Sequence, residues 1–251
     1  GLFRYGAGRL AEEGTFRGLE GDLDRLRGLG TDIIWLMPIH PIGVEGRKGT
    51  LGSPYAIRDY RGINPEYGTR EDFVHLVDAI HDRGMKCIID VVYNHTSPDS
   101  VLAQTHPAYF LRDSEGRPTR KVADWWDVVD LDYTNRELWT YQIDTLKQWA
   151  AIVDGFRCDV AYQVPQDFWA DVFSKFRSEY SRRLYFLAEG EEPWLHEAGF
   201  DATYAWKLHH LLNDDRIDRH QPDNVHPKFL KFRKFPLGCG EGAFGGRLTG
   251  V

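Results

Sequence analysis

Short apolar runs alternate with amphipathic segments along most of the chain. Four runs have the length and composition of buried strands: residues 32–37, 87–90, 155–161 and 184–188. Four segments place apolar side chains three or four residues apart, as on one face of a helix: residues 19–29, 71–83, 135–151 and 165–180. A further strand is expected at residues 200–206, followed by the start of a helix at 207–214. Buried strands that alternate with helices are typical of a parallel sheet, so the pattern predicts an α/β fold with the rhythm of a βα-barrel.

Three of the apolar runs close on an acidic residue, namely Asp90, Asp159 and Glu189. The carboxyl ends of parallel strands meet at one rim of a barrel, so we expect these carboxylates to share a pocket. Arg157 lies two residues before Asp159, and alternation along a strand turns both side chains to the same face. A guanidinium beside a carboxylate favours its ionised form, which a carboxylate nucleophile requires. A structural ion pair is the alternative for this pair taken alone.

The sequence around these residues resembles the α-amylase superfamily, glycoside hydrolase family 13. The runs similar to its first three signature regions occur in the family's order: Asp90-Val-Val-Tyr-Asn-His95, Gly155-Phe-Arg-Cys-Asp159 and Leu187-Ala-Glu189. The resemblance extends from about Gly14 to about Asp215 and implies a (β/α)8 TIM-barrel. We expect residues 1–251 to form one partial barrel, with about strands 2 to 6 or 7, and residues 96–134 to form a short inserted excursion after strand 3.

The resemblance implies retaining hydrolysis of α-glucosidic bonds in oligosaccharides or polysaccharides. Asp159 would attack the anomeric carbon, and Glu189 would protonate the departing oxygen and then deprotonate the incoming water. Arg157 would contribute to substrate binding and keep the pKa of Asp159 low. His95 would hydrogen-bond the sugar hydroxyls beside the reacting carbon, and Asp90 would support Arg157 and the floor of the pocket.

Other positions near these motifs carry weaker expectations. The family's tyrosine that matches Tyr55 stacks on the sugar, although spacing alone favours Tyr55 and Tyr60 as cover for the core of their own loop. Asn94 matches a residue that binds structural calcium in many members, so calcium is allowed, while no cofactor is required. The adjacent Trp125 and Trp126 could stack on sugars, but packing is favoured for at least one of them.

Composition narrows the classes of partner. A chain of 251 residues that is 42% hydrophobic can bury one large core, and a net charge of −7 argues against nucleic acid and suits a neutral carbohydrate. No apolar run approaches the roughly 20 residues of a membrane span, and no signal segment is evident, so we expect no membrane partner and favour the cytoplasm. The cysteines, at positions 87, 158 and 239, lack metal-ligand spacing and are interpreted as reduced packing residues.

Both ends of the chain depart from the family's pattern. The fourth signature, Asn-His-Asp, has no counterpart: residues 229–235 could form strand 7, but Pro236-Leu-Gly follows. Residues 238–251 are rich in glycine, and residues 1–13 make a poor strand. We therefore expect the ends to be artefacts of truncation or reading frame, and the chain as given to be a poor or inactive enzyme.

Two alternatives to a hydrolase remain open. The missing fourth signature favours a catalytically impaired, barrel-derived binding or scaffold protein, but such a protein needs neither Asp159 nor Glu189. A transglycosylase or isomerase of the same family, acting for example on trehalose or sucrose, would share the chemistry and the signatures.

Overall fold

The computed structural model describes residues 14–213 and 248–250, which fall into two units. Residues 14–203 and 248–250 belong to the larger unit. Residues 204–213 belong to the other unit, whose described part is essentially helix α8 (Trp206–Asn213). In the described part of the chain, no helix combines the length and the apolar character that crossing a membrane requires.

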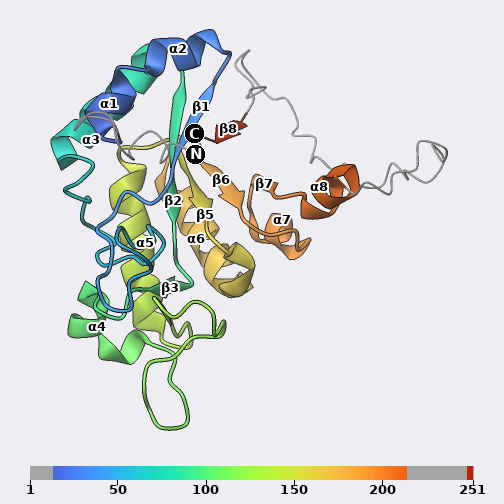
Figure 1. Ribbon diagram of the computed structural model, residues 1–251. Coiled ribbons are helices and arrows are strands. Elements are labelled where there is room, and N and C mark those ends of the chain that lie inside the picture. Colours follow the sequence, from blue (N-terminus) through green and yellow to red (C-terminus); the bar gives the residue numbers. More distant parts are fainter. Residues whose placement is uncertain (1–13, 214–247, 251) are drawn as a thin grey trace. The chain divides into compact units, whose positions relative to one another are not determined.

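A parallel sheet of six strands forms the centre of the larger unit, in the order β7-β6-β5-β2-β1-β8 (Figure 1). The strands are β1 (Ile33–Leu36), β2 (Lys86–Val91), β5 (Gly155–Cys158), β6 (Tyr185–Ala188), β7 (Ala202–Thr203) and β8 (Leu248–Gly250). Every neighbouring pair is parallel. The protein therefore has the partial βα-barrel expected from its pattern, with β1, β2, β5, β6 and β7 as strands 2 to 6.

Helices connect the successive strands. They are α3 (Arg70–Asp82), α5 (Arg136–Ala150), α6 (Gln166–Glu179) and α7 (Trp194–Ala198). The first three confirm the predicted helices, because local signals set their ends: Thr69 and Asp72 form a capping box on α3, and Asn135 caps α5. The single helix expected at residues 19–29 is wrong. Gly21 and Asp22 interrupt it, and two short helices result, α1 (Phe16–Glu20) and α2 (Leu23–Gly28).

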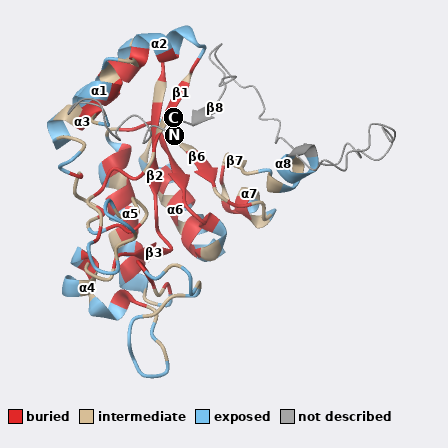
Figure 2. Ribbon diagram, viewed as in Figure 1, coloured by how far each residue is buried: buried red, intermediate tan, exposed pale blue. Residues whose placement is uncertain are grey.

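The core lies between the strands and the helices, and Figure 2 shows strands β1, β2, β5 and β6 as mostly buried. Trp149 of α5 and Trp169 of α6 are fully buried, as befits the inner faces of these amphipathic helices. Cys87 and Cys158 are free and buried, which confirms their role as packing residues. At Gly155 a Cβ atom would lie 2.0 Å from the carbonyl oxygen of Tyr185, so β5 and β6 can approach only through a glycine.

The excursion after β2 contains little regular structure. It holds α4 (Val101–Thr105), the 3-10 turn η2 (Pro107–Tyr109) and β4 (Val129–Asp130), which pairs antiparallel with β3 (His95–Thr96). Much of the loop at residues 112–126 is exposed (Figure 2). The division of the chain into a barrel and an inserted excursion remains a prediction.

The C-terminal part differs from expectation in two places. The strand predicted at residues 200–206 is reduced to Ala202–Thr203, because Trp206 already starts α8. Within the glycine-rich segment, where no strand was expected, Leu248–Gly250 pairs with β1. Ladder hydrogen bonds use backbone groups alone, so a segment poor in packing side chains can still pair. Residues 1–13, the candidate strand 229–235 and Cys239 lie outside the described residues.

Candidate active site

The polar residues predicted at the strand ends do converge at one rim. In the register of β2 and β5, Asp90 lies directly opposite Arg157. The backbone ladder continues one step beyond the strands, since the N–H of Asp159 donates to Val91 and that of Glu189 to Cys158 (both 2.9 Å). Strand pairing therefore brings the four predicted residues to the carboxyl end of the sheet.

The guanidinium of Arg157 is the meeting point of the carboxylates. Its Nη1 lies 3.0 Å from each carboxylate oxygen of Asp90 and 2.9 Å from Oδ1 of Asp159. Its Nη2 lies 2.8 Å from Oε2 of Glu189. The Arg157 side chain is only 5% exposed, and that of Asp90 is fully buried. One buried cation thus holds three carboxylates in fixed orientations.

Burial dominates the electrostatics of this cluster. It raises the pKa of Asp159 well above its usual range, the charge of Asp90 raises it further, and Arg157 opposes both. Burial likewise raises the pKa of Asp90, against the lowering effect of Arg157. The expectation that Arg157 keeps the pKa of Asp159 low is therefore wrong for the protein without substrate. A single guanidinium shared among several carboxylates does not offset their desolvation.

The turn after Asp159 links the two candidate catalytic residues. Val160 has φ 35° and ψ 47°, and it is the one non-glycine residue with positive φ in the described part of the chain. This conformation directs its N–H to Oε2 of Glu189, 2.8 Å away. A β-branched residue adopts it at a cost, and such strain is concentrated at functional sites. The residue after Asp159 thereby helps to orient Glu189.

His95 is buried beside Asp159, and burial lowers its pKa to about 4. Its Nδ1 lies 3.0 Å from Nδ2 of Asn94, while Oδ1 of Asn94 accepts a hydrogen bond from Nζ of Lys121 at 2.7 Å. Because the ammonium must face the amide oxygen, Nδ2 donates to Nδ1, and the proton of the neutral ring resides on Nε2. That Nε2 is 3.9 Å from Oδ2 of Asp159, too far for a hydrogen bond. It can therefore donate to a ligand.

Tyr55 and Tyr60, both in the loop before α3, have different surroundings. The hydroxyl of Tyr55 donates to Oδ2 of Asp90 (3.1 Å), and its half-buried ring lies 5.9 Å from Cζ of Arg157. Tyr60 is buried, and its hydroxyl donates to the carbonyl of His95 (2.6 Å). Core packing, which spacing favoured for both, therefore describes Tyr60, whereas Tyr55 borders the carboxylate cluster.

Sequence reasoning missed Trp35 as a site residue. The ring of Trp35 lies 5.2 Å from Cζ of Arg157, and its buried indole nitrogen has no hydrogen-bond partner among the described residues. The signal available in the sequence was a tryptophan, which carries a polar N–H, between two aliphatic residues of the apolar run. Neither Trp125 nor Trp126 is fully buried. Trp125 lies against His95, with ring centroids 5.3 Å apart, and Trp126 is 55% exposed below the ammonium of Lys48.

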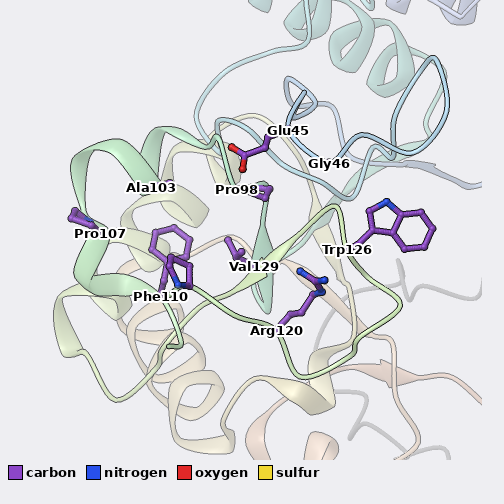
Figure 3. Close-up of a pocket in the computed structure, with 10 residues that line it drawn as sticks. Glu45, Gly46, Pro98, Ala103, Pro107, Phe110, Arg120, Trp126 and Val129 are labelled. Carbon is purple, nitrogen blue, oxygen red and sulfur yellow. The ribbon is translucent and has the colours of Figure 1, made fainter. Parts of the chain in front are cut away.

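A separate cavity of about 410 Å³ lies between the excursion and the loop around Glu45 (Figure 3). Its lining is formed by Glu45, Gly46, Pro98, Ala103, Pro107, Phe110, Pro118, Arg120, Trp126 and Val129. Of the residues considered for catalysis or sugar binding, Trp126 alone lines it, and none of the predicted catalytic residues does. We therefore place the candidate active site at the Arg157 cluster, where the ionisable groups converge.

Comparisons with known proteins point to one family. The family model of the α-amylase catalytic domain matches residues 3–128. An α-amylase structure from Lactobacillus plantarum is 52% identical, over 77% of this chain and 50% of that chain, with a TM-score of 0.74. The α-amylase MalA of Haloarcula japonica is 32% identical over 64% of this chain and 24% of its own length. An α-1,4-glucan:maltose-1-phosphate maltosyltransferase of Myxococcus xanthus is 29% identical over 76% of this chain and 32% of its own length.

The match is partial in length. The chain spans about a quarter to a third of these two curated relatives and half of the solved structure. With the family model matched over half of the sequence and the fold shared with the solved amylase, the chain belongs to the α-amylase catalytic-domain family.

Proposed function

We propose that the chain carries catalytic residues for cleavage of α-glucosidic bonds with retention of configuration. The observation that supports this most is the placement of Asp159 and Glu189 on the two amino groups of one guanidinium, that of Arg157. Retaining enzymes hold nucleophile and acid about 5 to 5.5 Å apart, whereas inverting enzymes leave room for a water between them. Hydrogen bonds from both carboxylates to one guanidinium support the closer arrangement.

In this proposal Asp159 forms the bond to the anomeric carbon while Glu189 donates its proton to the departing glycosidic oxygen. Water, deprotonated by Glu189, then attacks the same carbon and releases Asp159. Both steps pass through an oxocarbenium-like state that carries positive charge. A cluster of three carboxylates around one guanidinium favours such a charge. The single positive charge of Arg157 does not balance the negative charges of three ionised carboxylates. The same positive charge would favour the ionised form of Asp159.

The proposed substrates are α-glucans and maltooligosaccharides. The Nε2–H of His95 supplies a donor for a sugar hydroxyl beside Asp159, and the ring of Tyr55 supplies an apolar face next to the cluster. Arg157 is enclosed by carboxylates and aromatic rings, so its contribution to sugar binding is through the groups that it orients.

The test is incubation of the full chain with maltooligosaccharides, with products separated by chromatography and their first-formed anomer identified by proton NMR. We expect slow release of the α-anomer from the unaltered chain, which lacks the fourth signature, and no detectable product from Asp159→Asn and Glu189→Gln. The exposed Asp82→Asn variant is the matched control. Initial release of the β-anomer, or full activity in either variant at the Arg157 cluster, would contradict the assignment.

Transfer rather than hydrolysis is the second candidate, and the maltosyltransferase relative from Myxococcus xanthus favours it. The glycosyl-enzyme would be the same, but an acceptor sugar would take the place of water. Adding maltose 1-phosphate with a glucan acceptor distinguishes the two, because transfer lengthens the acceptor whereas hydrolysis yields free maltose. Trehalose and sucrose in the same assay test the isomerase alternative.

A further inference from the structure

Lys121 places its ammonium among oxygen atoms from three segments of the larger unit. Its Nζ is 2.7 Å from Oδ1 of Asn94, 3.3 Å from the carbonyl oxygen of Gln163 and 3.6 Å from Oδ2 of Asp130. Asn94 follows β2, Asp130 lies in β4, and Gln163 ends the 3-10 turn η3 (Ala161–Gln163) just after Asp159. The backbone N–H of Lys121 also donates to Oδ2 of Asp130 (3.0 Å), so this residue is held at both ends.

An amide oxygen, a backbone carbonyl and a carboxylate are the ligand types that a hard cation such as Ca²⁺ prefers. Asn94 is also the residue to which the family resemblance assigns calcium. One observation favours a metal, since Oδ1 of Asp130 is buried and has no hydrogen-bond partner among the described residues. The remaining observations oppose it. The ammonium occupies the approach to Asn94, and residues 14–213 contain no group of three or more His, Cys, Asp or Glu side chains arranged for a metal.

We propose that the ammonium of Lys121 supplies the positive charge of this oxygen cluster, in the place of a calcium ion. A divalent ion bound to Asn94 would lie within a few ångströms of the ammonium and be repelled by it. The chain therefore carries its own cation, and its stability does not depend on added Ca²⁺. Because the side chain of Lys121 is 44% exposed, free Ca²⁺ has access to compete, and the proposal can be tested directly.

The position of Lys121 also affects the candidate active site. Its ammonium fixes the orientation of the Asn94 amide, and the amide in turn fixes the proton of His95 on Nε2, the nitrogen that faces Asp159. Its second contact, with the Gln163 carbonyl, holds the segment that follows Asp159. Lys121 is thus a positioning residue that acts through Asn94, in addition to linking the excursion to the strand ends.

Thermal unfolding of the full chain in excess EDTA and in millimolar CaCl2 or MgCl2 tests the proposal. For the unaltered chain we expect the same Tm in every condition and no heat of Ca²⁺ binding by calorimetry. Lys121→Ala removes the ammonium and frees the oxygens, so its Tm in EDTA should fall by about 2 to 4 °C and recover with CaCl2. Lys121→Met should show the same fall with less recovery, because its side chain still fills the space. Lys175→Ala, which breaks an exposed pair with Asp171, is the matched control and should not respond to Ca²⁺.

NMR of the chain labelled with ¹⁵N-histidine tests the positioning role of Lys121. A purely stabilising role would not change the tautomer of His95. The signal of His95, assigned with His95→Gln, should report the proton on Nε2 in the unaltered chain and a tautomer mixture in Lys121→Met. A Tm of the unaltered chain that rises with CaCl2 and falls with EDTA would overturn the proposal, because calcium would then displace the lysine. A Lys121→Ala variant that is destabilised but does not respond to Ca²⁺ would also overturn the proposal. Lys121 would then form only an ordinary ion pair with Asp130.

Discussion

Nη1 of Arg157, in β5, donates to Oδ1 of Asp159, the residue directly after that strand, across 2.9 Å. The same nitrogen donates to both oxygens of Asp90. Asp159 therefore shares the positive charge of Arg157 with other carboxylates. This explains how a carboxylate in direct contact with a guanidinium can keep a raised pKa.

Replacing Arg157 by Leu removes the group that opposes this rise. We expect the pKa of Asp159 to increase further, because burial and the charges of Asp90 and Glu189, which both raise it, are then unopposed. Carboxyl ¹³C NMR on labelled aspartate measures it in this chain, and in an active family member the acidic limb of kcat/KM should move to higher pH. Arg183→Leu, which breaks the pair with Asp201, is the control. An unmoved titration would show that Arg157 has no electrostatic effect on Asp159.

Asp159→Asn should abolish the slow activity of the chain, yet raise stability at neutral pH. The folded-state pKa of Asp159 is raised, so ionisation penalises folding as pH rises above the unfolded value of about 3.9. Removing the charge should increase Tm by a few degrees at pH 7 and leave it unchanged at pH 3. Scanning calorimetry at both pH values checks this, with Asp82→Asn as reference. A lower Tm at pH 7 would mean that the Arg157 contact stabilises the ionised form.

The burial of His95 predicts a second pH dependence of stability, separate from that of Asp159. Its folded pKa is lowered to about 4 from 6.5, so its neutral form is favoured by folding. The contribution to the free energy of unfolding is complete above pH 6.5 and is lost as pH falls toward 4, by at most about 3 kcal/mol. Urea unfolding between these pH values measures the slope. The slope should become shallower in His95→Gln, and an identical slope would assign the effect to other groups.

Gly155→Ala should prevent correct folding of the sheet. The added Cβ would lie 2.0 Å from the carbonyl oxygen of Tyr185, and backbone on the adjacent strand cannot rotate away. We expect a loss larger than the about 1 to 3 kcal/mol of ordinary overpacking, seen as aggregation or loss of near-ultraviolet circular dichroism. Gly28→Ala is the matched control, since nothing lies within 4 Å of a Cβ there. Equal stability of the two variants would contradict the close approach of β5 and β6.

The chain as given should hydrolyse a chromogenic α-glucoside only slowly. Its sequence contains no Asn-His-Asp, and the family's aspartate in that motif stabilises the transition state. Turnover should fall below the roughly 1 to 1000 per second that is usual for enzymes. Size-exclusion chromatography on the same sample shows whether a low rate comes from aggregates. A monomer with ordinary turnover would require another group in the role of the missing aspartate.

The repeating elements and the strand-end carboxylates could be predicted from the sequence because each depends on local periodicity. The spacing of Arg157 and Asp159 already placed them on one face, and the order of the apolar runs placed Asp90 and Glu189 at the same rim. The resemblance to the family then supplied their expected roles.

What could not be predicted depends on contacts between distant segments. The pKa of Asp159 is set by how many carboxylates share Arg157, a number that no single motif contains. Lys121 lies 27 residues after Asn94 in an irregular loop, and no periodicity indicates that its ammonium reaches that side chain. Trp35 was counted only as part of an apolar strand, although its ring borders the cluster.

The pairing of β2 with β5 has a kinetic consequence. Asp90 and Arg157 are 67 residues apart, and the whole excursion lies between them. Closing a loop of that length is entropically costly before any contact is gained, and such non-local pairings slow folding. We therefore expect the carboxylate cluster to assemble after the local helices, in the same event that encloses the excursion. Changes in the excursion that slow this closure would reduce the yield of folded protein even where they touch none of the residues at the rim.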